Sequence, residues 1–194
     1  LTGALQPGVT GKDVIIALCG AFNHDEVLNH AVEFAGDGLG QLTMDQRMSI
    51  ANMTTEWGAL AGVFPFDDVL CQWLHHRAAW LAERGTPRFT AEDVDRWAAD
   101  PRCADDDAVY AAALELDLAS VIPHVSGPDH VKVMRSLPDI EADRIAIQKA
   151  YLLSCVNGRL EDLRAAAKVV DGQHTAEGVQ FYVAAASETI QEQA

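Results

Sequence analysis

The chain has 194 residues, of which 49% are hydrophobic and 22% are charged, and this length suits one large domain or two small ones. The composition excludes a largely disordered chain. The formal net charge of −15 repels phosphate groups, so we expect no nucleic-acid partner. No stretch approaches the ~20 consecutive apolar residues of a transmembrane helix, so we expect no membrane partner.

Cysteine spacing argues against both a disulfide framework and a zinc site closed within this chain. The four cysteines are widely separated and form no CxxC pair: Cys19, Cys71, Cys103 and Cys155. A domain of this size needs no disulfide staples, so we expect a reducing compartment. Cys19 and Cys71 lie on apolar helix stripes and are predicted to be core thiols. The two ends, Leu1 and Gln191–Ala194, suggest a piece of a longer polypeptide.

Helix and strand signals follow one another through the first two thirds of the chain. Good N-capping residues precede four amphipathic or apolar stretches: Thr10, Thr43, Asp67 and Thr90. These signals predict helices over 11–21, 43–60, 67–85 and 90–100. Alternation and turn residues predict short strands over 32–35 and 62–66, a short acidic helix over 105–113 and a strand over 114–121.

The stretch from Ile122 to Pro138 is the best candidate for a linker, because it is rich in proline and contains Gly127. Beyond it, the pattern predicts strands over 150–153 and 181–186 with a helix over 160–170 between them. Such a β-α-β unit has parallel strands and a right-handed crossover. We therefore predict the α/β class, with an α/β domain over 1–122, a linker over 123–138 and the first β-α-β unit of a second parallel-sheet domain over 139–194.

The most informative local sequence places Cys155 between the end of a strand and the start of a helix. Ligand sites in open α/β sheets lie beyond the carboxyl ends of strands, and a cysteine near a helix N-terminus tends toward the thiolate. Asn157 and Gly158 suit a tight turn, and Arg159 could clamp a carboxylate. The alternative is a small buried residue at a strand end, followed by an ordinary turn.

A second candidate lies in the predicted helix over 43–60, where Asn52 and Glu56 are four residues apart and share one face. Their neighbours are mostly small or apolar, so this face is predicted to be buried. A buried carboxylate needs partners or a raised pKa, which often marks a functional site. The alternative is an ordinary helix whose polar side faces solvent.

Two of these segments carry a family likeness. Ser154–Arg159 reads SCVNGR and resembles the S-C-T-N motif of the aconitase superfamily, and Asn52–Ala59 reads NMTTEWGA and resembles its N-M-x-x-E-x-G-A segment. The order of further matches, including Ser126-Gly127-Pro128, also fits. The likeness covers essentially the whole chain. Val156 departs from the family pattern, because it replaces the usual threonine and removes a hydroxyl.

This resemblance implies an aconitase-like fold and a hydro-lyase of mitochondrial lysine biosynthesis that interconverts homo-cis-aconitate and homoisocitrate. Members carry a [4Fe-4S] cluster on three cysteines, and its open iron acts as a Lewis acid on a small tricarboxylate substrate. The resemblance assigns Cys155 to the first cluster cysteine and Asn52 and Glu56 to active-site positions. Asn157 corresponds to an asparagine beside the cluster, and Arg159 belongs to the same surroundings.

The other two cluster cysteines of the family form a CxxC pair that this chain lacks. One thiolate cannot hold a four-iron cluster, so we expect the chain alone to be inactive. Two other hypotheses stay open. The full-length protein could use the substrate of aconitase or of isopropylmalate isomerase, or the chain could be a non-catalytic α/β binding module. The sequence does not indicate the oligomeric state.

Overall fold

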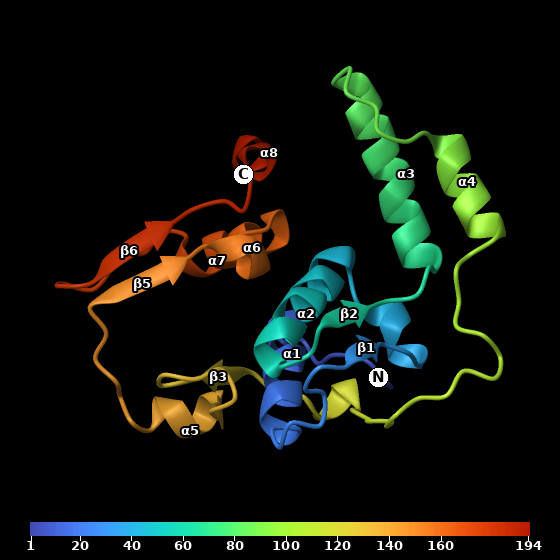
Figure 1. The fold of residues 1–194 in the computed structure, drawn as a ribbon. Coiled ribbons are helices and arrows are strands. Elements are labelled where there is room, and N and C mark those ends of the chain that lie inside the picture. The colour runs from blue at the N-terminus through green and yellow to red at the C-terminus, as the bar shows by residue number, and fades with distance from the viewer.

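A computed structural model describes all 194 residues of the chain, as helices and short strands in alternation (Figure 1). The α-helices are α1 Gly11–Ala21, α2 Met44–Trp57, α3 Asp68–Glu83, α4 Ala91–Ala99, α5 Leu137–Glu141, α6 Ser154–Asn157, α7 Leu160–Val170 and α8 Glu188–Gln193. The strands are β1 Ala31–Glu33, β2 Ala61–Val63, β3 His124–Ser126, β4 Met134–Ser136, β5 Lys149–Leu152 and β6 Gln180–Val183. Two 3-10 helices, η1 Asp37–Gln41 and η2 Leu118–Ser120, complete the set.

Helices α1 and α2 form the centre of the molecule. The apolar run in α1 is fully buried, and α2 contributes Ile50, Met53 and Trp57 to the same core. The helices approach closely at Gly11, where an added Cβ would lie 2.7 Å from the carbonyl oxygen of Gln46. Glycine at this position therefore permits the α1–α2 packing. The predicted boundaries of both helices are confirmed to within three residues.

Strands β1 and β2 pair in parallel beside α2. Gly62 lies against α2, because a Cβ there would come within 2.8 Å of the Thr54 side chain. The guanidinium of the buried Arg47 then ties α2 to α3. It donates to both carboxylate oxygens of Asp67, at 2.8 and 2.6 Å, and to the carbonyl oxygen of Leu39 at 2.7 Å. Asp67 also accepts from the backbone N–H of Leu70, and so caps α3 as the sequence predicts.

Two predictions for the region after α4 are wrong. Residues 105–113 form no helix, because they are almost all exposed and have no apolar face to bury. Residues 114–121 form no regular strand. A single bridge joins Thr2 to Asp117, whose side chain then accepts from the backbone N–H of Ala119 and turns the chain into η2. Local capping by an aspartate therefore outweighs the alternating pattern.

The stretch 123–138, predicted as a linker, folds into an antiparallel hairpin of β3 and β4 followed by α5. This hairpin packs on α1. The Asp13 carboxylate accepts from the backbone N–H of His124 at 2.9 Å, while its other oxygen accepts from the Thr10 hydroxyl at the start of α1. A Cβ on Gly20 would strike the Met134 side chain at 2.7 Å, so the contact is close at both ends of α1.

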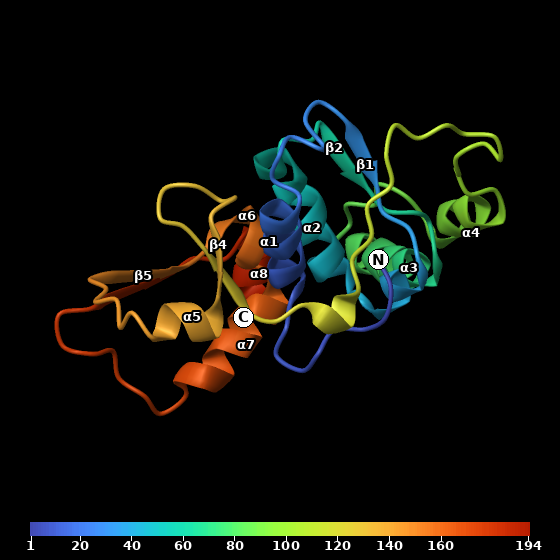
Figure 2. The same cartoon turned by 90° about the horizontal axis from the view of Figure 1, so that it is seen from below.

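The last part of the chain is a β-α-β unit, as predicted. Strands β5 and β6 pair in parallel, with Leu152 opposite Val183, and α7 lies between them in the sequence. The α/β class is thus confirmed, with three separate two-stranded sheets and none that runs through the whole chain. Figures 1 and 2 show α1 and α2 between the β5–β6 sheet on one side and α4 on the other. The division at 123–138 into two domains remains a prediction.

Candidate functional site

The segment from Leu153 to Gly158, called the cysteine loop below, contains the single-turn helix α6 and leads from β5 into α7. Ser154 adopts a φ of 103°, a left-handed conformation that a side chain rarely takes. Its hydroxyl oxygen accepts from the backbone N–H of Val156 at 3.2 Å, which helps to hold the turn. A Cβ on Gly158 would lie 2.7 Å from the Ser154 carbonyl oxygen and 3.0 Å from that of Ala184, so glycine allows this tight approach.

Cys155 lies on this loop as an exposed, free thiol, directly beyond β5. The Nδ2 of Asn52 on α2 lies 3.4 Å from its Sγ. The Sγ also lies 3.7 Å from Oδ1 of Asn52, to which the thiol donates, so the thiol faces the whole Asn52 amide. The structure therefore brings together two predicted site residues that are 103 positions apart in the sequence. Within this chain Cys155 is exposed, which differs from the alternative of a buried cysteine at this strand end.

Glu56, one turn further along α2, is exposed and accepts from the Thr55 hydroxyl at 2.8 Å. It thus lies on the open side of α2, and the predicted burial of this face does not occur within these residues. Glu56 also affects Cys19 in the core. Burial, together with the negative charge of Glu56, raises the pKa of the Cys19 thiol to about 11. Cys19 is therefore a neutral core thiol, as predicted, rather than a ligand.

Asn157 is held at the other end of the cysteine loop. Its Nδ2 donates to Oδ1 of Asp162 at 3.1 Å, and Oδ2 of the same carboxylate accepts from the backbone N–H of Arg159. The Oδ1 of Asn157 is buried without a hydrogen-bond partner. An unpaired buried acceptor is costly, so this oxygen is a candidate to receive a bond from a group outside the described contacts.

The side chain of Arg159 turns toward α2, and its nearest carboxylate is Asp45, with Nη1 4.0 Å from Oδ1. Glu161 lies in the same junction and accepts from the Thr43 hydroxyl at 3.1 Å. Burial raises the pKa of Asp45, although Arg159 opposes the shift, and burial together with the charge of Asp45 raises the pKa of Glu161. Arg159 thus lies at a junction between α2 and α7.

Sequence reasoning missed two residues that hold this site. Ser49, only 4% exposed, donates from Oγ to the carbonyl oxygen of Val156 at 2.8 Å, and Asp162 braces Asn157. Asp162 could have been found, because an acid at the third position of a helix is a capping signal. Ser49 gives no such signal, since its contact partner is 107 residues away.

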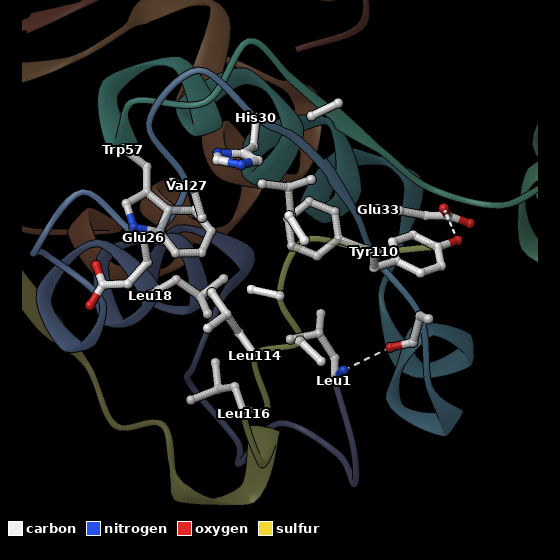
Figure 3. Close-up of a pocket in the computed structure, with 17 residues that line it drawn as sticks. Leu1, Leu18, Glu26, Val27, His30, Glu33, Trp57, Tyr110, Leu114 and Leu116 are labelled. Atoms are coloured by element: carbon white, nitrogen blue, oxygen red, sulfur yellow. Dashed lines mark hydrogen bonds between the residues drawn. The ribbon is translucent and has the colours of Figure 1, made fainter. Parts of the chain in front are cut away.

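A separate cavity of about 380 Å³ lies between β1 and residues 110–116, away from the cysteine loop (Figure 3). Its walls are mostly apolar and include Trp57, Leu18 and Leu114. The Tyr110 hydroxyl donates to Glu33 at 2.5 Å at its edge. None of the predicted site residues lines this cavity.

Within these residues no group of three or more His, Cys, Asp or Glu side chains could hold a metal ion. Cys155 offers one sulfur ligand, and the Asn52 amide is the only side chain of this site that contacts the sulfur. The donors present therefore fit one corner of an iron–sulfur cluster and leave its other ligands to be supplied from elsewhere. No helix has both the length and the apolar character needed to cross a bilayer.

The structure thus brings together one residue from each of the motifs SCVNGR and NMTTEWGA, with the Cys155 thiol beyond a strand end and Asn52 on a neighbouring helix. The chain matches the model of the aconitase family (aconitate hydratase) over residues 1–194 and belongs to that family. It is 50% identical to the mitochondrial homoaconitase of Candida albicans, 51% to that of Debaryomyces hansenii and 54% to that of Yarrowia lipolytica. Each comparison covers 100% of this chain but only 28% of the relative.

Proposed function

We propose that the full-length protein to which this chain belongs is a hydro-lyase with the activity of a homoaconitase. It would interconvert homo-cis-aconitate and homoisocitrate, a hydration of a small tricarboxylate, in lysine biosynthesis by the aminoadipate pathway. The proposal draws on family membership along the whole chain and on relatives named homoaconitase at about 50% identity. Because those relatives are named mitochondrial, we propose the same location.

The observation that carries the proposal is the contact between Cys155 and Asn52. These residues belong to two separate family motifs, and they meet at 3.4 Å across an interface between α2 and the cysteine loop. A binding module without chemistry would have no need for an exposed thiol that contacts an amide of the second motif. The non-catalytic alternative is therefore the weaker one.

In this proposal Cys155 supplies one of three thiolates to a [4Fe-4S] cluster, and the other two come from outside the chain. When bound, the cluster supplies a Lewis-acidic iron that favours loss of the substrate hydroxyl. Asn52 orients the thiolate, and Glu56, on the open side of the same helix, holds a carboxylate where a substrate or proton could reach it. Asn157 offers its unpaired Oδ1 to the cluster surroundings.

In this proposal Arg159 has mainly a structural role, whereas the sequence suggests that it binds a carboxylate. Its guanidinium lies 4.0 Å from Asp45, and its Nε is buried without a partner. It would orient α7 and the cysteine loop, and it would meet substrate only if the contact with Asp45 were exchanged for a substrate carboxylate.

The experiment that tests the function is a substrate comparison with the full-length protein. After anaerobic cluster reconstitution, turnover of homo-cis-aconitate is compared with that of cis-aconitate and of the isopropylmalate-type substrate. We expect the highest kcat/KM for homo-cis-aconitate. A preference for either other substrate would reassign the protein within the family, and a cluster-free protein without turnover would favour a binding module.

A further inference from the structure

The cysteine loop is anchored from two directions, and the two anchors differ in what they connect. Asp162 holds Asn157 from α7, which follows the loop directly in the sequence. Ser49 holds the carbonyl oxygen of Val156 from α2, more than a hundred residues earlier. Of these two anchors, only the Ser49 contact joins the loop to the helix that carries Asn52.

The geometry of α2 places the Ser49 contact close to the Cys155 thiol. Ser49 and Asn52 are three residues apart, so they share one helix face and are separated by about 4.5 Å along the axis. Their partners, Val156 and Cys155, are neighbours in the loop. The 2.8 Å bond from Ser49 and the 3.4 Å contact from Asn52 are therefore adjacent rungs between the same two segments.

The other contacts between α2 and the last part of the chain lie further away. Thr43 meets Glu161 and Asp45 meets Arg159, and both pairs lie at the N-terminal end of α2, two turns before Asn52. These contacts are half-exposed and involve charged groups, whereas the Ser49 side chain is buried. A buried hydrogen bond is the less easily exchanged for water.

We propose that Ser49 is a positioning residue that aligns Cys155 with Asn52 and so keeps this thiolate in place for the metal centre. This inference rests on the proposed function. Without the Ser49 hydroxyl, the buried carbonyl oxygen of Val156 loses its hydrogen-bond partner. The loop, which includes the strained Ser154, is then less strongly held in one conformation.

Four variants of the full-length protein test this role: Ser49→Ala, Ser49→Val, Ser49→Thr and Thr54→Val. Thr54 is the matched control, because it is buried on the same helix but its hydroxyl donates within α2, to the carbonyl oxygen of Ala51 at 2.7 Å. Valine and threonine are nearly equal in shape. The comparison of Ser49→Val with Ser49→Thr therefore isolates the effect of the hydroxyl, even if Ser49→Ala fails to fold.

Two rates are measured: removal of iron by a chelator from the reconstituted protein, and amide hydrogen exchange of residues 153–158 in the cluster-free protein. We expect Ser49→Ala and Ser49→Val to lose iron roughly 10- to 100-fold faster than wild type, as for other residues that orient a metal ligand. Exchange in the cysteine loop should accelerate as well. Ser49→Thr and Thr54→Val should keep both rates near those of the wild type.

Hydroxyl-free variants at position 49 that match Thr54→Val in both rates would overturn the inference and leave the proposed function intact. A wild-type protein that binds no cluster would instead overturn the proposed function. In that case the exchange comparison on the cluster-free protein still decides whether Ser49 anchors the loop.

Discussion

Cys155 owes its exposure to its immediate neighbours. Ser154 takes the strained φ of 103°, Gly158 allows the backbone to fold back on itself, and the thiol is left beyond the strand end instead of packing into the sheet. Cys19 shows the opposite case, because complete burial keeps its thiol protonated. Position in the fold, rather than residue type, thus separates the candidate ligand from the core thiol.

In the full-length protein we expect Cys155→Ser to abolish hydratase activity through loss of the cluster. Serine is nearly isosteric with cysteine at this exposed position, so the fold should persist, but its oxygen is far less suited than thiolate sulfur to cluster iron. Iron content, turnover and circular dichroism together check this result.

The matched comparison is Glu56→Gln, which alters a charge on the open side of α2 without removing a ligand. It should keep the iron and slow the reaction by roughly 10- to 100-fold. A Cys155→Ser protein with normal iron content and turnover would show that this cysteine has no role in the metal centre.

The junction of Asp45 and Glu161 predicts a pH-dependent stability. Burial raises the pKa of Glu161 above the ~4.3 of an unfolded chain, so the folded state binds this proton more tightly than the unfolded state. The free energy of unfolding therefore falls as pH rises from the pKa of Glu161 in the unfolded chain through its raised pKa in the folded state.

Glu161→Gln should raise the free energy of unfolding at pH 7 by less than about 1 kcal/mol, and this gain should shrink as pH falls toward 4. Urea unfolding at pH 7 and pH 5 measures the difference. Glu177→Gln, at an exposed loop position, is the control. A gain at position 161 that is the same at both pH values would contradict this explanation.

At the scale of elements, the helices were predicted best because their signals are local. Capping residues Thr43 and Asp67 define where α2 and α3 begin, and the structure shows both side chains accepting the expected backbone N–H. The helix predicted over 105–113 is absent because these residues are exposed and have no apolar face to bury. The strand predicted over 114–121 is absent although Leu118 and Val121 are buried, because Asp117 turns the chain into η2. The hairpin within 123–138 was missed because its stability comes from contacts with α1.

The candidate site shows the same difference between local signals, which the sequence reveals, and long-range packing, which it does not. Its residues could be chosen from short motifs, because Cys155 and Asn157 lie within one loop and Asn52 and Glu56 within one helix. Their mutual placement could not be predicted from spacing or periodicity, since it depends on the packing of α2 against the cysteine loop. Arg159 illustrates the limit, because only the structure places it near Asp45.

A further prediction concerns the close approach at Gly158. Gly158→Ala should destabilise this chain by about 1 to 3 kcal/mol, because the new Cβ would meet the backbone carbonyl oxygens of Ser154 and Ala184. Gly40→Ala is the control, since a Cβ there meets nothing within 4 Å. Urea midpoints that shift equally for both variants would show that the cysteine loop is not tightly packed.

At the scale of the whole molecule, the chain holds an incomplete site. It spans 28% of the length of the curated relatives that it matches, and the proposed function assigns one of its cysteines, Cys155, to a cluster that needs three. Its β5–β6 sheet also leaves Tyr151 and Tyr182 stacked on each other but exposed, whereas parallel sheets are normally covered on both faces. Under the proposed function, other parts of the full-length protein would complete the site and cover this sheet.

The most direct measurement is therefore anaerobic iron–sulfur reconstitution of the 194-residue chain and of the full-length protein side by side, followed by iron and sulfide analysis. We expect about four iron atoms per molecule in the full-length protein and essentially none in the chain alone, because a single thiolate cannot retain a cubane cluster. About four iron atoms and cubane absorption in the chain alone, or no cluster in the full-length protein, would contradict the assignment of Cys155 as one of three ligands.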